Sequence, residues 1–103
     1  MPKKILQINV RFTISAEELA KEFEAAAVHI AEVPGLKWKI FGINEEQGEA
    51  AGLYLFEDDA SRTAYLEGPI MARMKTLEAF SDITMKFFDC VEGASAITRG
   101  PIK

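Results

Sequence analysis

The order of strand-like and helix-like patterns of apolar residues along the chain constrains its fold more than any other feature. Four segments have the alternating or wholly apolar pattern of β-strands; they are residues 4–12, 36–43, 49–56 and 82–90. Other segments place apolar residues three or four positions apart, as amphipathic helices do; they are residues 16–30, 59–67 and 70–79. The predicted order is therefore strand, helix, strand, strand, two short helices and strand.

Local signals support these boundaries. Residues 15–18 read Ser-Ala-Glu-Glu, which is a capping box that starts a helix. Pro34 ends that helix, because a proline disfavours helical geometry at the residue before it. Residues 44–48 are polar and contain a glycine, which favours a hairpin turn, and Asp58 or Asp59 can cap the next helix. This order predicts an α+β, ferredoxin-like βαββαβ fold, in which helices cover one face of a four-stranded antiparallel sheet.

Composition excludes several classes of protein. A chain of 103 residues allows one domain, and residues 93–103 read as a C-terminal tail without a strong pattern. The net charge is −4 and no basic run occurs, so neither nucleic acid nor a membrane surface is an expected partner. No apolar stretch reaches the length of a membrane span, and the N-terminus does not read as a signal peptide. The single cysteine, Cys90, cannot form an internal disulfide, so we expect a cytoplasmic protein.

One face of the predicted sheet carries more aromatic residues than a solvated face should. In the first strand, the residues that alternation directs toward the helices are Leu6, Ile8, Val10 and Phe12. The opposite face of the sheet is then expected to carry Gln7, Asn9, Arg11, Lys37, Lys39, Phe41, Tyr54, Phe56, Lys86 and Phe88. A second copy of the chain is the simplest cover for such a face, so a homodimer is predicted. Its expected interface residues are Asn9, Arg11, Tyr54, Phe56 and Phe88.

The usual catalytic motifs are missing from the sequence. It has no P-loop and no GxGxxG, so a nucleotide cofactor is not expected. His29 and Cys90 are the only residues of their types and no carboxylate cluster surrounds either, so no metal site is predicted. A nucleophilic cysteine would need His29 as its base, and nothing in the sequence brings the two together.

Six segments together resemble one family; they are Leu6–Phe12 (LQINVRF), Val33–Lys39 (VPGLKWK), Glu49–Phe56 (EAAGLYLF), Ala64–Glu67 (AYLE), Ala72–Leu77 (ARMKTL) and Lys86–Asp89 (KFFD). The sequence is similar in these segments, and over residues 4–90 as a whole, to the YdhR-type monooxygenases of the dimeric α/β-barrel superfamily. The resemblance implies a barrel built from the sheets of two subunits, with a pocket in each subunit between sheet and helices. It also implies oxygenation without flavin, haem or metal, and therefore no cofactor.

The resemblance leads to a hypothesis about the site. In a cofactor-independent monooxygenase an aromatic or polycyclic substrate supplies the electrons to O2 after it loses a proton. The protein then has to provide a dry apolar pocket, hydrogen-bond donors and a base. We expect His29, Trp38 and Tyr65 to be the catalytic residues, with Trp38 turned toward the helices. The expected substrate-pocket residues are Phe23, Met71 and Met74.

Each of these residues also has a purely structural interpretation. Trp38 can be a core residue whose N–H meets a carbonyl, Tyr65 a half-buried helix residue, and His29 a residue at the edge of the apolar stripe. The methionines can be adaptable core fillers. At the level of function, the alternatives are a non-catalytic dimer that binds an apolar ligand, and an isomerase that uses His29 as its base.

Overall fold

The computed structural model describes residues 2–103 and confirms the predicted order of elements. The elements are β1 (Lys4–Phe12), α1 (Ala16–Ile30), β2 (Leu36–Asn44), β3 (Glu49–Phe56), α2 (Asp59–Leu66), α3 (Pro69–Met74), β4 (Phe80–Asp89) and α4 (Glu92–Ile97). The four strands form one antiparallel sheet in the order β2-β3-β1-β4. This is the ferredoxin-like α+β fold.

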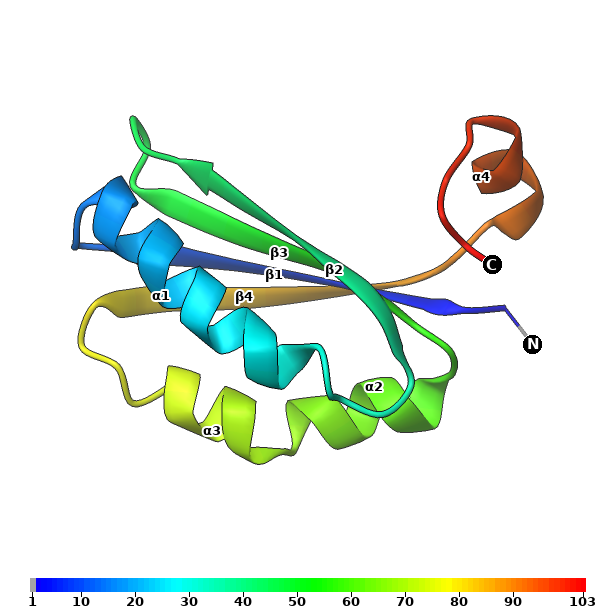
Figure 1. Cartoon of the computed structure of the whole chain (residues 1–103), viewed down its shortest axis with the longest axis horizontal. Helices are drawn as coiled ribbons and strands as arrows, with labels where there is room; N and C mark the ends of the chain where they lie inside the picture. The colour runs from blue at the N-terminus through cyan, green and yellow to red at the C-terminus, as the bar shows by residue number, and fades with distance from the viewer. Residues whose placement is uncertain (1) are drawn as a thin grey trace.

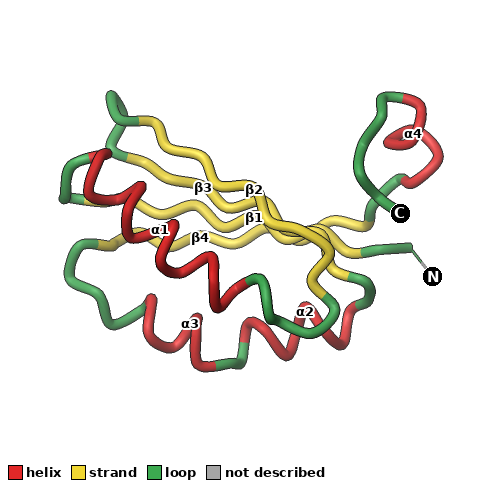
Figure 2. The backbone as a smooth tube through the Cα atoms, in the orientation of Figure 1, coloured by secondary structure: helices red, strands yellow, loops and turns green. Residues whose placement is uncertain are grey.

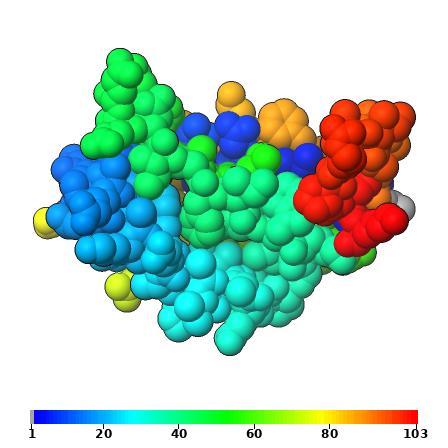
Figure 3. Space-filling model, turned by 45° about the horizontal axis from the view of Figure 1, so that its top comes forward, coloured from blue at the N-terminus to red at the C-terminus, as the bar shows by residue number. Residues whose placement is uncertain are grey.

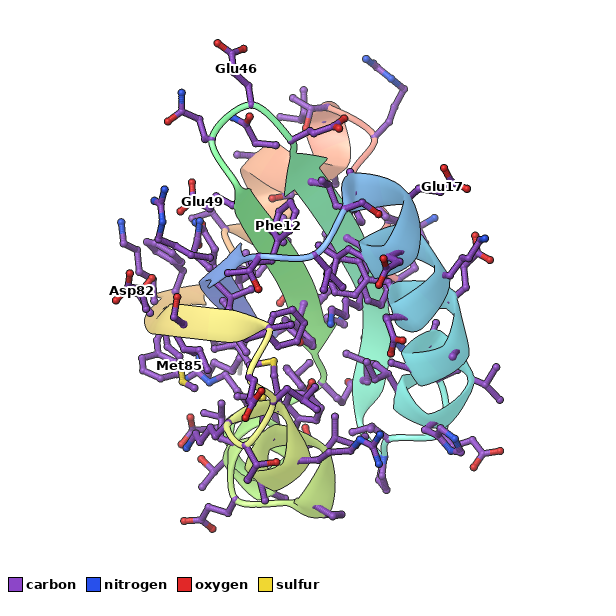
Figure 4. All side chains as sticks on the ribbon, turned by 90° about the vertical axis from the view of Figure 1, so that its left-hand side faces the viewer. Phe12, Glu17, Glu46, Glu49, Asp82 and Met85 are labelled. Atoms are coloured by element: carbon purple, nitrogen blue, oxygen red, sulfur yellow. The ribbon has the colours of Figure 1, made fainter. Side chains whose placement is uncertain are left out.

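The helices α1, α2 and α3 all lie on one side of the sheet (Figure 1). Figure 4, which looks along the strands, shows α1 and α3 against the same face. The helix α4 instead stands at the end of the sheet where the two chain termini lie (Figure 2). We call the face that α1, α2 and α3 do not cover the open face.

Side chains satisfy free backbone groups at the start of α1 and α2 and just after the end of α3. The Oγ of Ser15 accepts a hydrogen bond from the Glu18 N–H at 3.1 Å, and an Asp58 carboxylate oxygen accepts one from the Ser61 N–H at 2.8 Å. Both predicted caps are thus confirmed. The helix α3 ends at Met74, earlier than the predicted 79, and the Thr76 hydroxyl donates to a carbonyl of its last turn. Part of the predicted tail is helical, because α4 begins at Glu92.

The core lies between the sheet and the helices, and it corrects two predictions about the faces. Tyr54 and Phe56 were expected on the dimer face, but both are fully buried beneath α2 and α3. The pairing of β1 with β3 explains this, since Tyr54 lies directly opposite Leu6 and shares its face. The third strand is apolar on both faces, so its pattern alone could not show which side meets the helices.

A register shift in β2 corrects the predicted direction of Trp38. Leu36 pairs with Phe56, but Trp38 pairs with Leu55, so one extra residue lies between them. After this bulge, Trp38 and the residues that alternate with it point to the open face, and Lys39 points toward the helices. The strict alternation assumed from the sequence predicted the reverse.

The open face retains three of the five expected interface residues, Asn9, Arg11 and Phe88. The Asn9 amide donates to Glu49 at 3.4 Å, and Arg11 donates to the Gln47 carbonyl at 2.9 Å. Among the apolar side chains of this face, Phe88 is 48% exposed and Ile40 is 56% exposed. Figure 3 shows a lower surface over the strands between two projections, the β2–β3 turn and the C-terminal segment.

Hydrogen bonds tie the C-terminal segment to β2 and to the residue before β1. The Cys90 N–H donates to the Lys3 carbonyl at 2.8 Å, which continues the pairing of β1 with β4. Further on, the indole N–H of Trp38 donates to the Pro101 carbonyl at 2.6 Å. Within residues 2–103, no helix combines the length and the apolar character that crossing a membrane requires.

Candidate functional site

A small apolar cavity of about 30 Å³ lies between the sheet and the helices α1 and α3. Its lining includes Phe23 of α1, Met74 of α3, Lys39 and Phe41 of β2, and Gly52 and Tyr54 of β3. Two of the three predicted pocket residues, Phe23 and Met74, therefore line this cavity. The third, Met71, is fully buried in the neighbouring core and does not line it.

The cavity lies beneath the middle of α1, between the two buried residues of that helix. Of the 15 residues of α1, the two fully buried ones are Leu19 and Ile30. Phe23 lies between them, is half-buried, and contacts Phe41 with ring centroids 5.0 Å apart. Two side chains that can change rotamer, Phe23 and Met74, thus close the cavity on its helix side.

Lys39 is the charged residue of this cavity, and its ammonium lies over two aromatic rings. The Nζ atom is 4.0 Å from the centre of the Phe41 ring and 4.5 Å from that of the Tyr54 ring. Such contacts attract a cation to the negative face of a ring. In residues 2–103, no carboxylate lies within ion-pair distance of this Nζ.

A glycine in the neighbouring strand makes room for the lysine. A Cβ atom at Gly52 would lie 2.8 Å from the Lys39 Cε and 3.1 Å from a ring carbon of Tyr54. The lysine chain therefore lies over the sheet where a side chain from β3 would otherwise stand. Burial among these groups lowers the pKa of Lys39 to about 8, because desolvation disfavours the charged ammonium.

Two tyrosine hydroxyls meet beside the cavity. The Tyr54 and Tyr65 oxygens are 2.9 Å apart and form a buried hydrogen bond. Burial raises the pKa of Tyr54, and the Tyr65 hydroxyl beside it raises it further. Burial also raises the pKa of Tyr65, partly opposed by the hydrogen bond from Tyr54. Both groups are therefore neutral phenols at physiological pH.

A larger, mostly apolar groove of about 680 Å³ opens on the other side of the tyrosine pair. It lies between the C-terminal end of α1 and the helices α2 and α3, and both Tyr65 and His29 line it. Its floor includes Gly35, which has a left-handed φ of +82° and sits against Ser61 of α2. The two tyrosines thus join the wall of the small cavity to the wall of this groove.

The three predicted catalytic residues do not meet at one site. His29 and Tyr65 share the groove, but Trp38 lies on the open face and binds the C-terminal segment. Sequence reasoning missed Lys39, which it assigned to the opposite face. The signal that could have located it is Gly52, because a glycine inside a strand often marks a close approach of another group.

A metal centre has little support in the described part of the chain. Residues 2–103 contain no group of three or more His, Cys, Asp or Glu side chains arranged to hold a metal ion. His29 is exposed at the edge of the groove, and Cys90 is a buried thiol whose Sγ lies 3.9 Å from the Ser95 hydroxyl. The candidate site is therefore built from Lys39, the tyrosine pair and apolar side chains.

Solved structures of other proteins share this fold. SnoaB, a cofactor-independent oxygenase from Streptomyces nogalater, is 14% identical with a TM-score of 0.71, and the match covers 87% of this chain and 94% of that one. The heme degrader MhuD from Mycobacterium tuberculosis is 18% identical with a TM-score of 0.65, covering 84% of this chain and 95% of that one. A protein of unknown function from Nitrosomonas europaea is 21% identical with a TM-score of 0.70, and the match covers 88% of this chain and 91% of that one.

Comparison with curated proteins gave no significant match. The sequence profile of one family, described as "Putative mono-oxygenase ydhR", matches residues 5–101, which is nearly the whole chain. The chain therefore belongs to the YdhR family.

Proposed function

We propose that the protein is a monooxygenase that oxidises an aromatic or polycyclic small molecule with O2 and without a bound cofactor. The reaction takes place in the apolar layer between the sheet and the helices α1 and α3. The observation that carries the proposal is the aromatic-walled cavity at Phe23, Phe41 and Tyr54, in a chain of the YdhR family. The likeness to a cofactor-independent oxygenase at low identity supports it through the fold alone.

The substrate enters this layer by displacing the side chains that close the cavity. A cavity that holds benzene measures about 150 Å³, so the space of about 30 Å³ has to widen before an aromatic ring fits. Phe23 and Met74 are half-buried, and their rotation opens the layer toward the gap between α1 and α3. The walls then exclude water from an electron-rich, deprotonated substrate, which reacts with O2 directly.

Two copies of the chain form the working unit in this proposal. The exposed Ile40 and Phe88 of the open face are apolar side chains that a second sheet would cover, and Asn9 and Arg11 lie among them. A symmetric dimer through this face adds core that a single small domain lacks. We also propose a cytoplasmic location, in which the buried thiol of Cys90 stays reduced.

Oxygen uptake tests the proposal directly. The purified protein is mixed with a panel of quinols and anthrones, and O2 consumption and product mass are followed. Turnover above the uncatalysed rate, with one oxygen atom added to the product, supports a monooxygenase. If the whole panel gives only the uncatalysed rate, the proposal is wrong. Thermal stabilisation by the same compounds without product then identifies a non-catalytic binding protein.

A further inference from the structure

A half-buried ammonium without an anionic partner is the feature of this cavity that the proposed function does not yet use. Lys39 is directed inward from β2, lies against the faces of Phe41 and Tyr54, and is next to Gly52, which leaves it room. None of the carboxylates in residues 2–103 pairs with it. Aromatic faces compensate only part of the hydration that a buried cation loses.

We propose that Lys39 is a catalytic residue that binds the ionised hydroxyl of the substrate, and that the ligands of this site are therefore phenols or enols that bind as their anions. The inference rests on the proposed function for the reaction that follows, but the binding step stands by itself. A ligand oxyanion supplies the negative charge that the protein does not. An uncharged ligand would leave the ammonium buried and unpaired.

The surroundings of Lys39 favour this chemistry over an ordinary surface lysine. Apart from Lys39, Tyr54 is the titratable residue of the cavity lining, and its hydroxyl is already bonded to Tyr65. With its pKa near 8, Lys39 exists partly as the neutral amine at slightly alkaline pH. The amine can then take the proton of the ligand hydroxyl, which leaves an oxyanion beside the new ammonium.

The remaining lining residues define the rest of the ligand. They are apolar or aromatic, so the part of the molecule that carries the hydroxyl is a flat hydrophobic ring. The ammonium holds the oxygen at one edge of this ring, against β2 and β3. Such an anion is the electron-rich form of a phenol, which is the form that can transfer an electron to O2.

The test compares two probes of matched shape, 4-nitrophenol and its methyl ether 4-nitroanisole, in binding to the purified full chain. The phenol absorbs at different wavelengths as neutral molecule and as anion, so the bound form is read directly. We expect the wild type to bind 4-nitrophenol as the phenolate and to lower the apparent pKa of the bound phenol by about one unit. It should prefer the phenolate about tenfold over the ether.

The variants are Lys39→Met and, as the matched control, Lys37→Met. Lys37 lies two residues away in β2 and instead pairs with Glu57 on the surface, at 3.4 Å. Lys39→Met should abolish the preference and the pKa shift of the probe, while Lys37→Met should keep both. Because methionine suits an apolar cavity, the first variant should fold, and circular dichroism checks that it does.

Three results would overturn the inference. The first is equal binding of the phenolate by the wild type and Lys39→Met, the second is binding of the phenol in its neutral form, and the third is the absence of binding by the wild type. Oxygen uptake separates this inference from the proposed function. Turnover that persists in Lys39→Met contradicts only the role of Lys39, and phenolate binding without turnover contradicts only the monooxygenase.

Discussion

The hydroxyl of Tyr54, on β3, lies 2.9 Å from the hydroxyl of Tyr65, on α2, and both side chains are buried. The bond connects the sheet to α2 between the small cavity, which Tyr54 lines, and the larger groove, which Tyr65 lines. Each phenol satisfies the other, so neither leaves an unpaired polar atom in the core.

Removing both hydroxyls of this pair should cost less stability than the sum of removing each one alone. Tyr54→Phe or Tyr65→Phe leaves a buried phenol without its partner, at a cost of about 1–3 kcal/mol in the free energy of unfolding. The double variant removes both polar groups and should cost less than the sum of the two single changes. Urea unfolding of the four proteins measures the difference, and strictly additive costs would contradict the coupling.

The burial of Lys39 should reduce stability at neutral pH. Its folded pKa of about 8 is below the value of 10.5 for a free lysine, so folding is opposed most strongly below pH 8. The difference corresponds to about 3 kcal/mol, as an upper bound. Lys39→Met should therefore stabilise the protein at pH 7, and Lys37→Met should not.

The lowered pKa of Lys39 also determines how the stability of the protein depends on pH. Between pH 8 and 10.5 the unfolded chain holds a proton that the folded chain has lost, so the contribution of Lys39 makes stability rise with pH in this window. The rise should be missing in Lys39→Met. Unfolding free energies at pH 7 and at pH 9.5 for the two proteins give the comparison, and parallel pH dependences would show that the ammonium is well solvated.

Gly35 should tolerate no side chain. Its φ is +82°, and a Cβ there would overlap the side chain of Ser61. Gly35→Ala should cost about 3 kcal/mol from the left-handed backbone and the overlap together. Gly93→Ala is the control, because a Cβ at that position meets nothing within 4 Å. Thermal unfolding should show a large loss for the first variant and little change or a small gain for the second.

Charges on the open face should prevent the proposed dimer. Ile40→Lys combined with Phe88→Lys places two charges where a second sheet would pack, and sedimentation should then report a monomer. Val28→Lys is the control, since Val28 is 65% exposed on α1, on the other side of the sheet. A wild type that sediments as a monomer at high concentration would contradict the dimer itself.

The order of the elements could be predicted from the sequence because each signal is local. The capping side chains of Ser15 and Asp58 lie within three residues of the N–H groups they bind, and alternation is visible within one strand. Hydrophobic period then determines which segments are strands and which are helices. The ferredoxin-like fold follows from that order, and no long-range contact had to be known.

The composition of the site could not be predicted in the same way, because it depends on pairing between strands. The face of Tyr54 is set by its position opposite Leu6, a residue 48 positions earlier in the chain. The bulge between Leu36 and Trp38 then reverses every later assignment in β2. For this reason the alternating pattern predicted Lys39 on the face away from the helices, although its strand was predicted correctly.

The bulge in β2 also means that one strand sequence has two possible linings. If the strand paired regularly from Leu36 onward with no change of length, it would slip by one position, so Trp38 would lie opposite Tyr54 and Lys39 would turn to the open face. Deleting the extra residue, Lys37, would instead remove the bulge and leave Trp38 and Lys39 on the faces they now occupy. Register alone, with no substitution, therefore decides whether this fold presents a cationic or an aromatic lining to a ligand.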